Sequence, residues 1–248
     1  MMKVAIVGDS IANGLGVAGK SYKDIIQTRI VDRLGINVEL FDYTASAKPI
    51  METNRDNLEE IINVKPDFII FGHGITEAMI RPNPKYLKLL PRRYRKPGWM
   101  DPRPFYSKKW RKRVLEKLES GFRWRLKSFI ILKSGGESIV SKSDFVNEVN
   151  LFTSSILTQT QSNIIFVTQM GVDEKYYPYS QGKLEEYENE IINICKGDTR
   201  LAHIRGSEIL SPWSDFFEDH FHPNIIGHQK LAASIYEKIL KIKEGNAA

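Results

Sequence analysis

The stretch Val4-Ala5-Ile6-Val7-Gly8-Asp9-Ser10 decides the fold of this chain. Four apolar residues in succession are typical of a strand buried on both faces, as at the centre of a parallel sheet. Gly8 allows the backbone to turn sharply where the strand ends, and Ser10 follows at its carboxyl end. Open α/β sheets bind ligands at that end of their strands, so Ser10 is a candidate nucleophile. Serine also caps helices, so this position alone leaves a structural role open.

Outward from this stretch, apolar runs alternate with amphipathic segments. The runs predicted as strands are residues 4–7, 38–41, 67–71, 163–168 and 201–204. The segments predicted as helices are residues 21–34, 54–64, 144–160, 181–196 and 224–242. A βαβαβ order implies right-handed crossovers and a parallel sheet. We therefore expect a three-layer α/β sandwich with about five parallel strands in the order 2-1-3-4-5, a flavodoxin-like arrangement.

One segment interrupts this alternation between the third and fourth predicted strands. From about Arg81 to Ser143 no strand is predicted, and residues 107–133 form a strong helical stretch. Four residues recur at every fourth position along it: Trp110, Val114, Leu118 and Phe122. We expect this apolar stripe to pack on the rest of the protein. The chain thus reads as one domain over residues 1–248, with a mainly helical insertion over residues 81–143.

The net charge of +6 is concentrated in this insertion. Residues 92–133 contain 15 Lys and Arg and three acidic residues, a balance of +12, whereas the rest carries 21 basic and 27 acidic residues, a balance of −6. Three interpretations stay open: a solvated cap over a pocket, an interfacial helix on anionic lipid, and a surface for an anionic polymer such as an acidic polysaccharide. No recognised nucleic-acid motif accompanies the charge, so we expect no specific nucleic-acid partner.

The groups that would activate a serine lie near the other end of the chain. A nucleophilic serine needs a base to take its proton and a third group to hold that base in the right tautomer. Asp219 and His222 are three residues apart, so one turn can bring the carboxylate onto the imidazole. Pro223 sets the backbone for the first turn of the closing helix. The two motifs together predict a triad of Ser10, His222 and Asp219.

With Gly8-Asp9-Ser10 at the first strand and Asp219-x-x-His222 before the last helix, the chain resembles the SGNH hydrolases, also called the GDSL esterase/lipase family. The resemblance spans nearly the whole chain. It implies a structural role for Asp9 and two oxyanion donors besides the serine amide: a glycine amide after the second strand and an asparagine side chain after the third. By position, Ala47 stands for the glycine. Thr76 stands for the asparagine, or Gly74 in another register.

These features predict a serine hydrolase acting on a carboxylic ester, an O-acyl group of a carbohydrate or a similar small polar substrate. Losing one oxyanion donor lowers turnover by about 10²–10³-fold, so the departures at Ala47 and Thr76 predict a slow or specialised enzyme. Two alternatives remain: a glycan O-acyltransferase, and a catalytically degraded binding protein for an acidic glycan or a membrane surface.

Cofactors and compartment are predicted from what the sequence lacks. The glycines after Ser10 follow no nucleotide-binding pattern, and no residues have metal-ligand spacing, so we expect no cofactor and no metal. Cys195 is the only cysteine, which excludes an internal disulfide and fits a reducing compartment. We see no secretory leader before the first strand. We expect a cytoplasmic protein, or one peripheral to the inner face of the membrane.

Overall fold

A five-stranded parallel sheet forms the centre of the computed structural model, which describes residues 1–88, 90–92, 95, 98–168 and 170–245. The strands are β1 (Met2–Gly8), β2 (Val38–Thr44), β3 (Phe68–Gly72), β6 (Asn163–Thr168) and β7 (Leu201–Arg205). Their spatial order is β2-β1-β3-β6-β7, and all neighbours pair in parallel. Counted along the chain this is the order 2-1-3-4-5, so the predicted topology is confirmed.

The strand that carries the Gly-Asp-Ser motif lies inside this sheet. β1 pairs with β2 on one side and with β3 on the other, so that Ile6 stands between Asp42 and Ile70. Val4, Ala5, Ile6 and Val7 are completely buried. Both faces of β1 are covered by helices, which explains why its apolar run shows no polar alternation.

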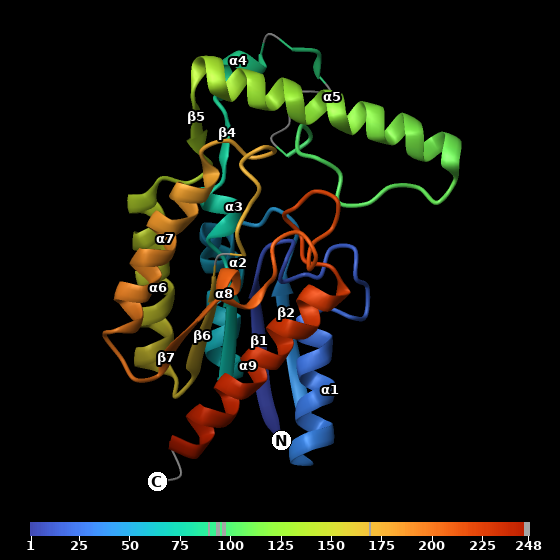
Figure 1. The fold of residues 1–248 in the computed structure, drawn as a ribbon. Helices are drawn as coiled ribbons and strands as arrows, with labels where there is room; N and C mark the ends of the chain where they lie inside the picture. Colours follow the sequence, from blue (N-terminus) through green and yellow to red (C-terminus); the bar gives the residue numbers. More distant parts are fainter. Residues whose placement is uncertain (89, 93–94, 96–97, 169, 246–248) are drawn as a thin grey trace.

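Helices form the two outer layers (Figure 1). On one face α1 (Tyr22–Leu34) packs beside α9 (Ile225–Gly245). On the other face α2 (Ile50–Val64), α6 (Lys142–Gln159) and α7 (Ser180–Cys195) pack in that order. A short helix, α8 (Gly206–Ile209), follows β7. The three-layer sandwich expected from the sequence is therefore present.

The insertion between β3 and α6 differs from prediction in its secondary structure. A short helix, α3 (Ile75–Ala78), leads into β4 (Ile80–Pro82), which pairs antiparallel with β5 (Gly136–Ser138). The expectation that residues 81–143 contain no strand is therefore wrong. The two strands have three residues each and include Pro82 and Gly136, so they leave no periodic signal. Between them lie α4 (Pro84–Leu87) and α5 (Trp110–Ser134); residues 89, 93–94 and 96–97 of the insertion fall outside the described residues.

The long helix α5 is oriented opposite to expectation. Its predicted inward stripe, Trp110, Val114, Leu118 and Phe122, is exposed by 70, 50, 68 and 57%. The buried residues are Ser120, Arg123, Lys127, Ser128 and Ile131. Polar partners from the preceding segment decide this orientation: Lys127 pairs with Asp101 at 2.6 Å, and Arg123 lies 3.8 Å over the ring of Trp99. The prediction that the stripe packs on the domain is therefore wrong.

No helix within the described part of the chain has both the length and the apolar character needed to traverse a bilayer.

Candidate active site

The turn after β1 places Ser10 at the carboxyl edge of the sheet. Gly8 has a φ of +154°, and a Cβ there would stand 2.6 Å from the Cβ of Ala12 and 2.7 Å from the carbonyl oxygen of Gly72. Only glycine fits such a close approach. The carboxylate of Asp9 accepts hydrogen bonds from the amide of Ile11 at 3.0 Å and from the hydroxyl of Thr76 at 2.6 Å. Asp9 therefore has the turn-bonding role that the resemblance implies.

Asp9 is almost completely buried, and its burial raises the pKa of its carboxyl group. The nearby Glu77 acts in the same direction, whereas the hydrogen bonds from Thr76 and Ile11 oppose the shift. Because its oxygens face the turn and Thr76, Asp9 holds the backbone that carries Ser10.

Three side chains from opposite ends of the chain form a continuous hydrogen-bonded series. The Oγ of Ser10 is 3.0 Å from Nε2 of His222, across 212 positions of sequence. The Nδ1 of His222 is 2.6 Å from Oδ2 of Asp219. A hydroxyl next to one ring nitrogen and a carboxylate at the other is the arrangement in which imidazole acts as a general base. The fold thus brings together Ser10, His222 and Asp219 in the order that the motifs predict.

Hydrogen bonds between its own residues hold the loop that carries Asp219 and His222. The second oxygen of Asp219 accepts the amides of Phe221 and His222, both at 3.1 Å. The amide of Phe217 donates to the carbonyl of His222 at 2.9 Å. The side chain of Asn224 donates hydrogen bonds to the carbonyls of Ser214 and Phe216 in the same loop. Its amide oxygen accepts hydrogen bonds from the amides of Ile226 and Gly227 in the first turn of α9. These bonds fix the ring of His222 relative to the helix that follows.

Ala47 lies in the loop after β2 and has the backbone conformation of a glycine. Its φ is +59°, in the left-handed region that an alanine adopts at a steric cost of about 1–2 kcal/mol. This explains why the resemblance places a glycine there. Within the described chain, neither the amide of Ala47 nor that of Ser10 donates to a protein acceptor, and both residues line the same cavity. Both amides are therefore candidate oxyanion donors.

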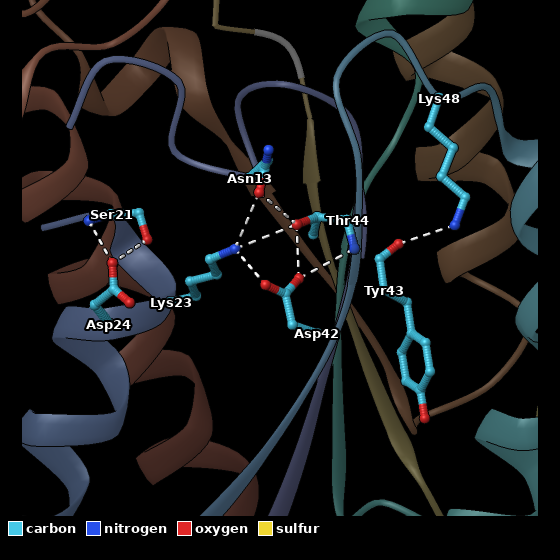
Figure 2. Close-up of polar contacts among 8 residues, drawn as sticks. All are labelled: Asn13, Ser21, Lys23, Asp24, Asp42, Tyr43, Thr44 and Lys48. Carbon is cyan, nitrogen blue, oxygen red and sulfur yellow. Dashed lines mark hydrogen bonds and ion pairs between the residues drawn. The ribbon is translucent and has the colours of Figure 1, made fainter. Parts of the chain in front are cut away.

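A polar network joins the end of β2 to the loop that follows Ser10 (Figure 2). The ammonium of Lys23 on α1 contacts Asp42, Thr44 and Asn13. Asn13 belongs to the loop after Ser10, whereas Asp42 and Thr44 end β2. Desolvation by itself would raise the pKa of the Asp42 carboxyl. The hydrogen bonds from Lys23 and Thr44 outweigh this effect and hold the pKa below its ordinary value. The network therefore ties the end of β2, which leads into the loop of Ala47, to the loop that follows Ser10.

Thr76 lines the cavity, but its hydroxyl hydrogen goes to Asp9. A threonine hydroxyl has one hydrogen to donate, so an oxyanion role for this group requires that bond to break. Gly74, the position given by the other register, is not brought to the cavity: its amide donates to Glu77 at 2.8 Å, and it packs against Phe145 and Ile191. The geometry leaves the amides of Ser10 and Ala47 as the available donors.

The insertion forms part of the wall of the site. A cavity of about 530 Å³ lies over Ser10 and His222, next to Ala47 and Thr76. Its other walls come largely from the insertion: Arg81, Gly98, Asp101, Pro102, Pro104 and Ile139. This volume is in the range of small-molecule sites, which hold about 300–1,000 Å³. The segment of residues 98–104, which we call the roof, therefore restricts what reaches Ser10.

A buried ion cluster, which the sequence does not predict, holds the roof in place. Asp101 pairs with Arg81 and with Lys127, each at 2.6 Å. Burial opposes ionisation of Asp101, but Arg81 and Lys127 hold the pKa of its carboxyl below the ordinary value. Burial lowers the pKa of Lys127 to about 8, against the attraction of Asp101. The signal that could have indicated Asp101 is its place among only three acidic residues in 92–133.

A second buried cluster supports the turn after β3. His73 is 3.0 Å from the hydroxyl of Thr53, and Glu77 accepts the amides of Ile50 and Gly74 at 2.7 and 2.8 Å. All these side chains are hidden from solvent, so their role is to join the turn to the start of α2. Among the described residues, no group of three or more His, Cys, Asp or Glu side chains is arranged to hold a metal ion.

Several solved structures share this architecture over almost their whole length. TesA is 10% identical, with a TM-score of 0.60 over 95% of this chain and 97% of its own. The acetylxylan esterase Axe2 from Geobacillus stearothermophilus is 14% identical, with a TM-score of 0.61 over 96% of this chain and 94% of its own. LAE5, an alpha/beta hydrolase enzyme from the metagenome of Lake Arreo, Spain, is 14% identical, with a TM-score of 0.58 over 93 and 91%.

No family model matches the chain, and no curated protein matches it. The structural similarity therefore bears on the fold. The central sheet, its strand order and the flanking helices are those of the SGNH hydrolase fold, so the fold predicted from the two motifs is confirmed.

Proposed function

We propose that the protein is a serine hydrolase that cleaves a carboxylic ester. The observation that carries this proposal is the series of hydrogen bonds from Ser10 through His222 to Asp219, at 3.0 and 2.6 Å. It lies at the base of a cavity that a small ester can enter. Such a series of hydrogen bonds activates the serine, because a serine hydroxyl attacks a carbonyl only when a base removes its proton.

In the proposed reaction, Ser10 Oγ attacks the ester carbonyl while Nε2 of His222 takes its proton. Asp219 keeps the hydrogen of the imidazole on Nδ1 and stabilises the charge that forms. The tetrahedral oxyanion binds the amides of Ser10 and Ala47. His222 then gives its proton to the departing alcohol, which leaves an acyl group on Ser10. Water, activated by His222, attacks this acyl-enzyme and releases the acid.

The proposed oxyanion hole has two clear donors. A third donor would be worth about 10²–10³-fold in turnover, so we expect a slower enzyme than one with three. The strained backbone at Ala47 supports a functional reason for this loop, since alanine holds a left-handed conformation there.

The proposed substrate is a small polar ester, with an O-acyl group on a carbohydrate as the first candidate. Arg81 and Asp101 give the cavity charged groups that can bind hydroxyls, while Leu15, Ile139 and Phe221 provide apolar surface for an acyl chain. Axe2 is an acetylxylan esterase, and replacing a serine or an aspartate in it gives a catalytic mutant, which supports the analogy. We also propose a cytoplasmic location, which the single cysteine supports.

The test is hydrolysis of p-nitrophenyl acetate and of acetylated xylo-oligosaccharides by wild type and by Ser10→Ala. We expect Ser10→Ala to lose at least about 10³-fold in kcat/KM. Ser46→Ala is the matched control, because Ser46 lines the same cavity and makes no hydrogen bond to His222 among the described residues. Equal turnover of wild type and Ser10→Ala would contradict the proposal.

A further inference from the structure

Large apolar side chains are exposed along the whole length of the outward side of α5. We define the outward face of α5 as Trp110, Val114, Leu115, Leu118, Phe122, Phe129 and Leu132. Each of these side chains is at least half exposed, and Trp110, Leu115 and Leu118 are exposed by about 70%. With 25 residues the helix is about 37 Å long. It lies across the end of the molecule opposite both termini, and its N-terminal half extends beyond the helices of the sandwich (Figure 1).

The inward side of α5 is mostly polar, and several of its side chains have partners in the preceding segment. Lys127 is bound to Asp101, Arg123 lies over Trp99, and the hydroxyl of Ser120 accepts the amide of Arg103 at 3.0 Å. Farther toward the N-terminus, Glu116 accepts the amide of Ser107 at 2.7 Å. These contacts fix the rotation of the helix, so the apolar side stays outward. Exposed apolar surface this extensive marks an interaction site in a soluble protein.

Cations lie within the outward face itself. Arg111, Leu118, Arg125 and Leu132 follow one another at steps of seven residues, and Leu115, Phe122 and Phe129 do the same. Residues seven apart lie on the same side of a helix. Positive and apolar side chains therefore alternate along one surface. Among the described residues, no carboxylate pairs with Arg111 or Arg125, nor with Lys108, Lys109 or Lys133 at the ends of the helix.

We propose that the outward face of α5 docks on an anionic lipid bilayer, with the helix lying in the plane of the interface. Apolar and aromatic side chains enter the boundary between headgroups and acyl chains. The arginines and lysines between them extend their charged ends to the lipid phosphates, as long cationic side chains do at such interfaces. The charge of the insertion, +12 in residues 92–133, complements an anionic surface.

Other occupants fit this surface less well. In a dimer built on this face, Arg111 and Arg125 of the two copies would meet with no acidic partner, which is unfavourable where water is excluded. An acidic polysaccharide would pair with the cations but would leave Trp110, Leu118 and Phe122 in water. A bilayer satisfies the charged and the apolar side chains at once.

The docking surface is attached to the candidate catalytic loop. Arg113 and Lys117 of α5 pair with Glu218, next to Asp219, at 3.1 and 2.9 Å. Residues 105–109 connect the roof to the N-terminal end of the helix, and the ring of Phe105 packs against Phe217. Docking would therefore set the orientation of the cavity relative to the bilayer. The docking proposal itself stands independently of the proposed esterase activity.

The experiment is co-sedimentation of the full chain with vesicles of phosphatidylcholine mixed with phosphatidylglycerol, and with vesicles of phosphatidylcholine alone. We expect binding to the mixed vesicles at low salt. Leu118→Gln/Phe122→Gln should lower the partition coefficient more than about tenfold. Arg111→Gln/Arg125→Gln should lower it about fivefold for each cation, an effect that disappears in high salt. These side chains are exposed, so thermal unfolding should be unchanged.

The matched control is Leu151→Gln on α6, where the side chain is exposed by 51% and lies outside the outward face of α5. This variant should bind as wild type does. Absence of binding to mixed vesicles at low salt would overturn the proposal. So would an equal loss with Leu151→Gln, a dimer in sedimentation velocity that Leu118→Gln/Phe122→Gln dissociates, or binding to acidic polysaccharide alone. Ester hydrolysis measured on the same samples separates failure of docking from failure of the esterase proposal.

Discussion

At the scale of single residues, one conservative substitution removes the bond between Thr76 and Asp9. In Thr76→Val the buried carboxyl of Asp9 loses a donor at 2.6 Å and keeps the shape of its surroundings. We expect the free energy of unfolding to fall by about 1–3 kcal/mol, since a buried acceptor is left without its partner. Thr76→Ser, which retains the hydroxyl, should stay close to wild type. Urea denaturation of the three proteins measures the difference.

The same substitution decides whether Thr76 acts on the oxyanion. Because its hydrogen is bound to Asp9, we expect Thr76→Val to slow acylation much less than the roughly 10²–10³-fold typical of a lost oxyanion donor. Stopped-flow measurement of acylation with p-nitrophenyl acetate gives the rate. A loss of that full size, restored by Thr76→Asn, would place the Thr76 side chain in the oxyanion hole instead.

His228 makes stability depend on pH. Its ring is buried, and Nδ1 accepts the amide of Tyr22 at 3.2 Å, so burial lowers its pKa from 6.5 to about 4. Between these values the unfolded chain binds a proton that the folded protein does not. The neutral His228 ring therefore stabilises the folded protein by about 3 kcal/mol above pH 6.5. This stabilisation is lost as the pH falls from 6.5 through 4. His228→Gln should flatten the pH dependence of the unfolding free energy over this range; parallel curves for the two proteins would contradict this account.

At the scale of elements, the ion cluster couples the roof to β4 and α5. In Asp101→Asn, Lys127 remains buried without its counter-ion, with 1% of its side chain exposed. Removing one partner of a buried pair costs about 3–5 kcal/mol. The control is Glu119→Gln, which removes an exposed pair with Arg103 and should cost less than about 1 kcal/mol. Chemical denaturation compares the two variants, and equal losses would show that the cluster does not hold the roof.

The elements differ in how far the sequence could predict them. Strands β1, β3 and β6 are unbroken apolar runs because both faces of the sheet are covered, so their pattern and order were predictable. The hairpin of β4 and β5 is too short to leave a pattern. The spacing of Trp110, Val114, Leu118 and Phe122 correctly indicates one apolar side of α5. It carries no information on where that side points, because partners such as Asp101 and Trp99 decide the rotation.

At the scale of the whole molecule, the candidate site and the docking surface lie at the same end. The carboxyl ends of the strands point toward the end of the molecule that α5 crosses (Figure 1). Ser10 and residues of the roof line one cavity there. The sequence could indicate Ser10, Asp219 and His222, because each stands in a short motif beside a predictable element. The rest of the cavity could not be predicted, since Arg81 and Asp101 meet only when the ends of the insertion pair through β4 and β5.

The central claim is that Ser10 is a nucleophile activated by His222, and covalent trapping tests it most directly. The measurement is reaction with a fluorophosphonate, followed by intact-protein and peptide mass spectrometry. We expect one adduct on the wild-type protein, located on Ser10, none on Ser10→Ala, and labelling at least about 10³-fold slower for His222→Asn. Absence of an adduct on the wild type, an adduct located on another residue such as Ser46, or equal labelling of Ser10→Ala would contradict the account.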